Sequence, residues 1–276
     1  MSDVVCHVCF RHCKLKEGDI GFCGARACRD GKSVCDNYGR ITSIALDPVE
    51  KKPLARFMSG KMVLSVGSYG CNMNCPFCQN DSISRADAES VPWRYLAPDE
   101  LAALAKARQP DGNIGVAFTF NEPMISWEYV RDAGAAVKAK GMANVVVTNG
   151  AVSQPVLEEV LPYIDAFNID LKCFTAEGYK KLGGDFEMVL AFIAAAAKSA
   201  HVELTTLVVP GISDTEQQVR ELASWVASLD RSIPLHITRF FPRGRYRDRQ
   251  PTPVQTLYRL AEVAQEKLDT VIVGNV

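Results

Sequence analysis

From Met62 onward, short apolar segments alternate with segments of helical pattern, and this alternation is the feature that most restricts the fold. The apolar segments are rich in β-branched residues and almost continuously hydrophobic, as buried parallel strands are. Repeated β–α units predict a parallel sheet with right-handed crossovers. Six or seven units suit a barrel or partial barrel better than a flat sheet, and a doubly wound sheet is the alternative. The predicted strands are 62–67, 115–120, 143–149, 164–170, 202–209, 234–240 and 270–274.

Two of the intervening helices carry start signals in the sequence. Ser213 and Glu216 have the spacing of a capping box. In the second helix, Thr252 is predicted to be the cap, Pro253 the first helical residue and Gln255 the partner that closes the box. The apolar face expected for the first helix consists of Val219, Leu222, Ala223 and Val226.

Composition indicates a globular chain with a core of ordinary size. Its 276 residues are 47% hydrophobic and 23% charged. A net charge of -1 gives no general attraction to nucleic acid or to an anionic membrane, and neither is expected as a partner. No secretory signal opens the sequence, and no apolar run approaches the length of a spanning helix. We therefore expect a cytoplasmic protein whose thiols are reduced.

The cysteines are concentrated at one end of the chain. Nine of the ten precede residue 79, and clustered reduced thiols indicate metal more than disulfides. This distribution predicts a cysteine-rich metal-binding module at 1–40. A short strand and connector follow at 41–61, and the β/α barrel occupies 62–276.

The amino-terminal cysteines are spaced as one closed metal site. Zinc and a [4Fe–4S] cluster both fit, as a structural centre or as a relay of electrons to the barrel. Cys28 and Cys35 make the ligand set ambiguous, and free reduced cysteines without metal are the alternative. The four best-spaced ligands are Cys6, Cys9, Cys13 and Cys23.

A second cysteine group follows the first predicted barrel strand. Cys71, Cys75 and Cys78 form the pattern CxxxCxxC, on the face where β/α barrels carry their chemistry. Three thiolates can hold three irons of a [4Fe–4S] cube and leave the fourth iron open to another ligand. The alternative is a zinc site that takes its fourth ligand from Cys173 or a histidine.

This loop resembles the signature of radical S-adenosylmethionine (SAM) enzymes, with the aromatic Phe77 before the last cysteine. The resemblance implies an oxygen-sensitive enzyme in which SAM chelates the open iron. One electron, supplied by an external flavodoxin or ferredoxin, then cleaves SAM to methionine and a 5′-deoxyadenosyl radical, which abstracts hydrogen from a substrate.

The ends of later strands resemble SAM-binding motifs of the same family. Glu122 in TFNEP resembles the acid beside the SAM amino group, although Phe120 and Asn121 replace two glycines. Thr148 and Asn149 in VTNG resemble a motif of glycyl-radical activating enzymes, with Val147 in place of an aspartate. A turn glutamate and an ordinary Asn-Gly turn are the alternatives.

The fourth predicted strand ends in DLK, where Asp170 and Lys172 point the same way. Such a pair suits a zwitterionic ligand, and a simple ion pair is the alternative. By resemblance, Asp170 lies near the SAM ribose and Lys172 near its carboxylate. Val208 resembles part of an adenine wall, and His236 resembles a ribose-side histidine or is a satisfied core residue. Cys173 is expected to be a buried thiol.

Across the whole chain the set of motifs resembles the radical SAM member of the AmmeMemoRadiSam system. That resemblance implies Memo-like and AMMECR-like partner proteins and leaves the substrate open, whether a small molecule or a protein. Relatives often continue past the terminal GNV with a cysteine-bearing tail. Activation of a glycyl radical enzyme, as in pyruvate formate-lyase activation, is the nearest alternative function. A non-catalytic Fe–S electron carrier or zinc-stapled scaffold is the alternative of another class.

An arginine-rich loop surrounds the end of the sixth predicted strand. It is either a solvated loop or an anion clamp over the active face, with Arg239 and Arg243 as candidate substrate contacts. Phe240 and Phe241 either line the adjoining pocket or pack. The other arginines of the run are Arg245, Arg247 and Arg249.

Overall fold

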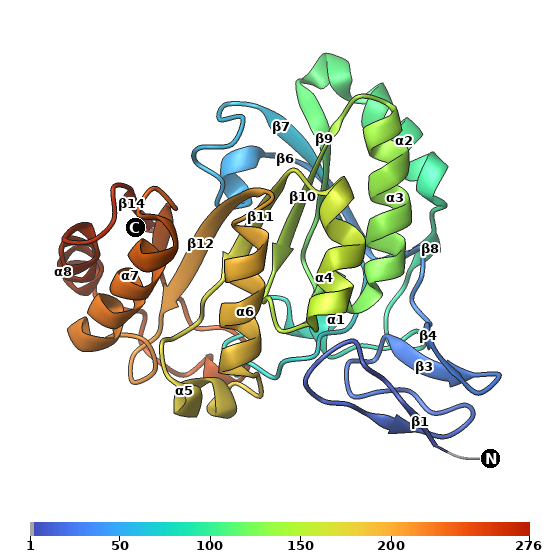
Figure 1. Cartoon of the computed structure of the whole chain (residues 1–276), viewed down its shortest axis with the longest axis horizontal. Helices are drawn as coiled ribbons and strands as arrows, with labels where there is room; N and C mark the ends of the chain where they lie inside the picture. Colours follow the sequence, from blue (N-terminus) through green and yellow to red (C-terminus); the bar gives the residue numbers. More distant parts are fainter. Residues whose placement is uncertain (1–2) are drawn as a thin grey trace.

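The computed structural model describes residues 3–276 and has an eight-stranded sheet at its centre (Figure 1). The strand order is β14-β13-β12-β11-β10-β9-β7-β6, and every neighbouring pair is parallel except β6 with β7. The predicted α/β fold with parallel strands is thus confirmed. The strands of the sheet are β6 (Ser43–Pro48), β7 (Met62–Gly67), β9 (Asn113–Phe118), β10 (Ala143–Thr148), β11 (Ala166–Asp170), β12 (His201–Val208), β13 (Leu235–Arg239) and β14 (Val271–Gly274).

Helices occupy the connections between the parallel strands. The α-helices are α1 (Asp81–Ser84), α2 (Pro98–Ala107), α3 (Trp127–Ala139), α4 (Gln154–Val160), α5 (Ala176–Lys181), α6 (Phe186–Ala196), α7 (Glu216–Asp230) and α8 (Val254–Gln265). Short 3-10 turns are η1 (Val49–Lys51), η2 (Gln109–Asp111), η3 (Pro123–Ser126), η4 (Leu161–Tyr163) and η5 (Gly244–Tyr246). Within residues 3–276 no helix is both long and apolar enough to cross a bilayer.

The two faces of the sheet are covered differently. On one face, strand residues such as Val146, Ile169 and Leu204 share a core with the helices, and α3, α4 and α6 lie across this face in Figure 1. On the other face, Val145 and Ala166 join a smaller cluster. A doubly wound sheet has helices on both faces, so this one-sided cover agrees with a partial barrel.

The segment that follows β6 closes the inner face near the start of the strands. Val49 and Leu54 are fully buried against Val63, Ala117, Val145 and Ala166. The Glu203 carboxylate on β12 accepts hydrogen bonds from the backbone amides of Ala55 and Arg56, at 2.9 and 2.7 Å. The predicted connector at 41–61 therefore supplies an antiparallel edge strand and a floor for the barrel.

Both predicted capping boxes are wrong. The hydroxyl of Ser213 donates to the carbonyl of Leu207, while Thr215 caps α7 by accepting from the amide of Gln218. Thr252 donates to the carbonyl of Val208, which leaves Pro253 at the N-cap position of α8. Each hydroxyl donates to a backbone carbonyl at the end of β12 instead of accepting from an amide of its own helix. The predicted apolar face of α7 (Val219, Leu222, Ala223, Val226) is buried as expected.

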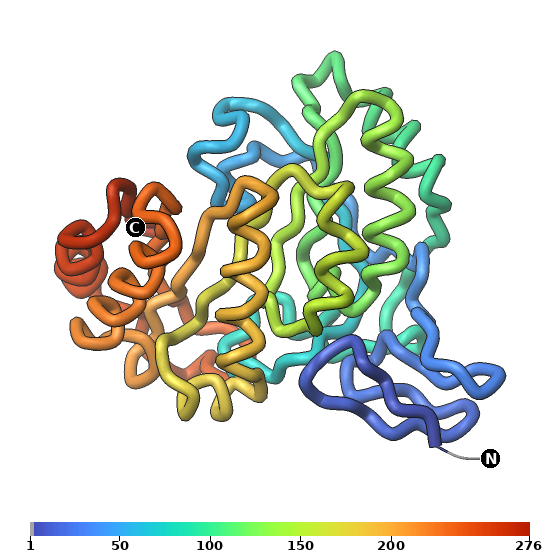
Figure 2. The backbone as a smooth tube through the Cα atoms, viewed as in Figure 1, coloured from blue at the N-terminus to red at the C-terminus, as the bar shows by residue number. Residues whose placement is uncertain are grey.

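Residues 3–40 form small antiparallel hairpins, seen as a separate lobe near α1 in Figure 2. Arg26 anchors this lobe to the barrel, because its buried guanidinium lies 2.7 Å from Glu128 on α3. Cys23 packs with Ile125 of η3. The short strands are β1 (Val4–Val5), β2 (Lys14–Leu15), β3 (Arg26–Arg29), β4 (Lys32–Cys35), β5 (Arg40–Ile41) and β8 (Arg94–Tyr95).

Candidate active site

The CxxxCxxC loop leaves β7 at its carboxyl end, as predicted, and is held by residues from distant parts of the chain. The side chain of Asn72 donates to the carbonyl of Ala151 at 2.7 Å. The guanidinium of Arg85 donates to the carbonyl of Cys71 at 2.9 Å and also to that of Met73. The loop is thus fixed by hydrogen bonds from its Asn72 side chain and to its backbone, which is how a metal-binding loop is pre-organised.

The three thiols of this loop are half-buried, and polar groups lie beside Cys71 and Cys75. The amide of Met73 donates to the Cys71 sulfur at 3.4 Å, and the side-chain amide of Asn149 lies 3.7 Å from the same sulfur. Burial raises the pKa of Cys75 to about 11, while the nearby Lys172 ammonium opposes that rise. Iron would hold these thiols as thiolates. A soft thiolate set with amide and ammonium groups around it suits an iron–sulfur cluster.

Cys173 does not serve as a fourth ligand. It is 1% exposed, and its sulfur faces the carbonyl of Thr175 at 3.8 Å. Among residues 3–276, no three His, Cys, Asp or Glu side chains lie close enough to hold one metal ion. The ligands of a cluster bind different irons and can lie farther apart than the ligands of a single ion.

Glu122 is the centre of a buried hydrogen-bond network. Its carboxylate accepts from the Met124 amide at 3.0 Å, the Thr148 hydroxyl at 2.7 Å and the Asn149 amide at 2.8 Å. Burial raises the pKa of Glu122 to about 7, against these hydrogen bonds. The structure therefore brings the predicted Glu122, Thr148 and Asn149 together, with the side chain of Asn149 directed at Cys71.

The TFNEP loop shows what replaces the two glycines of the related motif. Phe120 has φ +72°, the left-handed conformation that glycine adopts most easily. The Asn121 side chain accepts from the Ser68 amide at 2.9 Å and donates to the carbonyls of Tyr69 and Gly70. A side-chain amide thus ties this loop to the start of the cysteine loop, and Phe120 retains the glycine-like turn.

Asp170 and Lys172 lie side by side at the end of β11. The Lys172 ammonium is 2.9 Å from the Asp170 carboxylate, and the backbone amide of Lys172 donates to the Tyr179 hydroxyl at 3.1 Å. Burial lowers the pKa of Lys172, but the Asp170 carboxylate and the Cys75 thiolate outweigh it and the net shift is upward. Lys172 is therefore a firmly charged ammonium beside the cysteine loop.

Replacing Lys172 by alanine is expected to weaken SAM binding at least about tenfold, because a hydrogen bond to a charged group contributes about 1.5–3 kcal/mol. Iron content should stay unchanged, since Lys172 is no metal ligand. Equilibrium binding and iron analysis of the anaerobic protein measure both, with Lys181→Ala, whose exposed ammonium pairs with Glu177, as the control. Loss of iron in the Lys172 variant would contradict this placement.

Phe77 and Val208 are both buried. Phe77 packs between Phe240 and Tyr246, with ring centroids 6.5 and 6.2 Å away. Val208 has no exposed surface and belongs to the core shared with the helices. The predicted contacts of these two residues with SAM stay predictions, and for Val208 the structure offers no free side-chain surface.

His236 has a carboxylate partner. Its ring nitrogen Nε2 lies 2.7 Å from Glu203, whose other oxygen lies 3.0 Å from His201. Register places His236 beside Thr205 and Thr205 beside Asp170, so the histidine shares the level of the Asp170–Lys172 pair. His236 is thus a buried histidine with a hydrogen-bond partner, which is what the alternative prediction expected. Its contact with the SAM ribose stays a prediction.

The arginine-rich loop folds over the cysteine loop, as its position in the sequence suggested. The guanidinium of Arg245 donates to the backbone carbonyl of Asn74 at 2.7 Å, and its amide donates to Pro76. Arg239 donates to the carbonyl of Thr252 and stacks over Phe241, at 4.9 Å from the ring centroid. Arg243 is exposed beside them, where it can reach solvent-borne anions.

The four predicted amino-terminal cysteines line a single enclosed cavity. Burial raises the pKa of Cys9 to about 11, and the neighbouring thiols of the set add to the rise. Cys28 and Cys35 lie elsewhere: their thiols donate to Glu17 and Asn37, at 3.7 and 3.2 Å. Cys6, Cys9, Cys13 and Cys23 therefore share one cavity that Cys28 and Cys35 do not line, and the metal-binding role of these four stays a prediction.

Gly70 is where the cysteine lobe meets the cysteine loop. It has φ +92°, and a Cβ there would lie 2.3 Å from the carbonyl oxygen of Cys23. Gly70→Ala is expected to lower the free energy of unfolding by more than about 1 kcal/mol, through strain and this clash together. Gly60→Ala is the matched control, because Gly60 also has positive φ but nothing within 4 Å of its Cβ. Equal effects of the two changes in urea unfolding would contradict the close approach.

Several of these contacts have no signal in the sequence. Arg85 and Arg11 both bind backbone of the cysteine loop, and Arg11 donates to the carbonyl of Asn72 at 2.6 Å. Tyr179 supports Lys172 from α5. Of the residues in these contacts, only Asn72 belongs to a sequence motif, the CxxxCxxC loop. The others come from segments whose approach to the loop depends on the fold.

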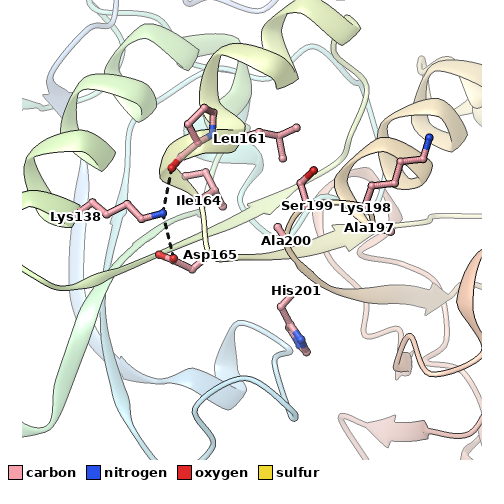
Figure 3. A pocket seen from close by; sticks show the side chains of 10 residues that line it. Lys138, Leu161, Ile164, Asp165, Ala197, Lys198, Ser199, Ala200 and His201 are labelled. Carbon is pink, nitrogen blue, oxygen red and sulfur yellow. Dashed lines mark hydrogen bonds and ion pairs between the residues drawn. The ribbon is translucent and has the colours of Figure 1, made fainter.

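A larger open cavity lies at the opposite end of the sheet (Figure 3). It is lined by residues at the start of β11 and β12, including Asp165 and His201. Lys138 crosses it, 3.4 Å from Asp165 and 3.1 Å from the carbonyl of Pro162. Catalysis in β/α barrels takes place at the carboxyl ends of the strands, so this cavity is not the candidate active site.

Comparison with known proteins agrees with this geometry. The profile of the radical SAM superfamily matches residues 65–226. The chain belongs to the radical SAM superfamily. An uncharacterized protein of Methanocaldococcus jannaschii is 37% identical over 280 residues, covering 100% of this chain and 82% of that protein. The pyruvate formate-lyase 1-activating enzyme of Escherichia coli is 27% identical over 183 residues, covering 64% of this chain and 74% of the enzyme.

Solved structures show the same fold. A radical SAM methyltransferase from Sphaerobacter thermophilus has a TM-score of 0.59 at 15% identity, covering 79% of this chain and 67% of that chain. Streptococcus suis SuiB bound to precursor peptide SuiA has a TM-score of 0.60 at 14% identity, covering 76% of this chain and 47% of that chain.

The radical SAM match includes the CxxxCxxC loop but not the amino-terminal cysteines. Its residues 65–226 run from β7 into α7 and include the CxxxCxxC loop, Glu122 and the Asp170–Lys172 pair. Membership of the superfamily implies a [4Fe–4S] cluster and SAM as cofactors. The amino-terminal cysteine lobe and the arginine-rich loop lie outside the match, so family membership assigns them nothing.

Proposed function

We propose that this protein is a radical SAM enzyme that generates a 5′-deoxyadenosyl radical at a [4Fe–4S] cluster held by Cys71, Cys75 and Cys78. The radical abstracts hydrogen from a small molecule or a partner protein. The observation that supports this most directly is the placement of three half-buried thiols and the Lys172 ammonium at the carboxyl ends of the barrel strands. When bound, the cluster supplies the electron that cleaves SAM.

The residues of the chain supply binding and orientation. Lys172 offers its ammonium to the methionyl carboxylate of SAM, and Asp170 keeps that ammonium in place. The same carboxylate can accept from a ribose hydroxyl. Because the pair is partly exposed toward the cysteine loop, a zwitterionic ligand can replace part of the ion pair without leaving a buried charge alone.

Glu122 has a different part in this proposal from the one its motif suggests. Its carboxylate already accepts three hydrogen bonds, from the backbone amides of Met124 and Asn149 and from the Thr148 hydroxyl. It therefore positions the Asn149 side chain beside Cys71, and only its remaining acceptor capacity is left for the SAM amino group. Glu122 is a positioning residue first.

The nearest alternative is activation of a glycyl radical enzyme. The similarity to the Escherichia coli activating enzyme favours this reading, as does a putative glycyl-radical enzyme activating enzyme of Methanocaldococcus jannaschii, 26% identical over 222 residues. Such a function needs the same radical and a protein substrate. A low-potential flavodoxin or ferredoxin would supply the electron in either case. We place this chemistry in the cytoplasm, where such donors and reduced thiols occur.

The experiment is anaerobic reconstitution with iron and sulfide, followed by SAM and dithionite and chromatography for 5′-deoxyadenosine. Formation that depends on protein and reductant supports the proposal. Memo-like and AMMECR-like proteins, added separately, test whether a partner is the substrate. A protein with full iron that forms no 5′-deoxyadenosine under all these conditions would favour an electron carrier or scaffold.

A further inference from the structure

The amino-terminal cysteine lobe contains two kinds of cysteine. Cys28 and Cys35 behave as ordinary thiols, since each donates to an oxygen of a neighbouring side chain. The other four face an enclosed cavity that they line with Val8, Gly21 and Ile125, and no oxygen or nitrogen acceptor for their thiols is found among residues 3–276. Those four are Cys6, Cys9, Cys13 and Cys23.

The backbone around these four sulfurs is shaped as ligand turns. The amide of Cys6 donates to the carbonyl of Cys13 at 2.9 Å and closes the first turn, in which His12 has φ +43°. The amide of Gly24 closes the second turn on the carbonyl of Gly21 at 2.9 Å. Amides two residues downstream face the sulfurs of Cys9 and Cys23, as the Met73 amide faces Cys71.

A zinc ion and a cubane cluster place different demands on four cysteines. Zinc requires four sulfurs at about 2.3 Å from one point, which brings the ligands into mutual contact. Here the four thiols line one enclosed cavity. A cubane cluster occupies such a space, because each cysteine binds a different iron.

The amino-terminal cysteine lobe is also hydrogen-bonded directly to the CxxxCxxC loop. The backbone amide of Cys71 donates to the carbonyl of Cys23 at 3.1 Å. Arg11, which lines the cavity, donates to the carbonyl of Asn72 at 2.6 Å. One hydrogen bond therefore connects a ligand of the amino-terminal site with a ligand of the barrel site.

We propose that Cys6, Cys9, Cys13 and Cys23 bind a second [4Fe–4S] cluster, closed by four cysteines, which passes electrons to the barrel cluster across the Cys23–Cys71 hydrogen bond. A low-potential ferredoxin or flavodoxin gives one electron, which takes the amino-terminal cluster from 2+ to 1+. The cluster returns to 2+ when the barrel cluster accepts that electron and goes from 2+ to 1+. The electron-transfer part rests on the proposed function, and the cluster itself does not.

The test uses the full chain with Cys71, Cys75 and Cys78 all replaced by alanine. Reconstituted wild type is expected to hold about eight irons and the triple variant about four, with the Mössbauer spectrum of a [4Fe–4S] cluster. Changing Cys9 to serine in the triple variant should remove or alter that spectrum, whereas Cys28→Ala in the triple variant should leave it unchanged. Zinc in place of iron, or an iron-free triple variant that is folded by circular dichroism, would overturn the second cluster.

Electron exchange has its own measurement. Dithionite-reduced wild type should give an electron paramagnetic resonance spectrum broadened by interaction between two reduced clusters, and the triple variant a simple spectrum of one. Two independent, unbroadened signals in the wild type would overturn the relay while leaving the cluster assignment standing. Neither readout depends on SAM cleavage, so failure of the proposed function would be seen separately.

Discussion

Replacement of Cys75 by alanine is expected to remove the barrel cluster and to abolish 5′-deoxyadenosine formation. Two cysteines cannot hold a cluster whose fourth iron must stay open, and the Lys172 ammonium lies near enough to Cys75 to oppose the rise in its pKa. Iron should fall by about four per chain in reconstituted protein, measured beside product chromatography.

Cys173→Ala is the matched control for this change, since Cys173 is a buried thiol whose sulfur faces Thr175 and not the loop. It should keep both iron and activity. Normal SAM cleavage by the Cys75 variant would refute the assignment of the loop, and equal loss in the Cys173 variant would mean that cysteine substitution itself damages the fold.

Part of the candidate site could be predicted from the sequence, and part could not. Cys71, Cys75 and Cys78 were predicted because three ligands in eight residues are a local property of the sequence. The Asp170–Lys172 pair was predicted because alternate residues of a strand share a face. Arg85 could not be predicted, because its contact with the Cys71 carbonyl depends on how the chain after the loop turns back.

Replacement of Glu203 by glutamine is expected to cause the largest loss of stability. Its side chain is fully buried and accepts four hydrogen bonds, from the rings of His201 and His236 and from the amides of Ala55 and Arg56. The amide group of glutamine would point hydrogens at some of these donors. We expect the free energy of unfolding to fall by about 3 kcal/mol or more near pH 7.

The effect should depend on pH in a defined direction. Burial raises the pKa of Glu203, but the four hydrogen bonds outweigh burial and lower the pKa to about 2. A lowered pKa means that the carboxylate stabilises the fold above its ordinary pKa of 4.5, and that this contribution is lost as the pH falls from 4.5 toward 2. The difference between wild type and variant should therefore shrink over that range.

Urea unfolding of the two proteins, both prepared free of iron, measures this difference, because cysteine-bound clusters are lost at acid pH. Glu177→Gln is the control, because Glu177 pairs with Lys181 on the exposed face of α5. Its unfolding midpoint should not change. A Glu203 variant with the stability of wild type, or a difference that does not vary with pH below 4.5, would contradict the role of this carboxylate in holding the floor of the barrel.

The sequence by itself determined the strands, the parallel α/β fold and the two cysteine groups. Apolar runs, two-residue alternation and cysteine spacing are all short-range properties, and each parallel strand of the sheet falls within a few residues of its predicted range. Helix caps failed for the opposite reason. Ser213 and Thr252 had acceptors available in neighbouring backbone that no local pattern reveals.

The tertiary structure alone decided which distant groups meet. It gave His236 a partner in Glu203, separated Cys28 and Cys35 from the other amino-terminal cysteines, and placed Cys23 against Cys71. These contacts depend on how the lobe docks on the barrel and how the segment after β6 closes its floor. Docking is fixed by burial and hydrogen bonding summed over many residues, so no single motif carries it.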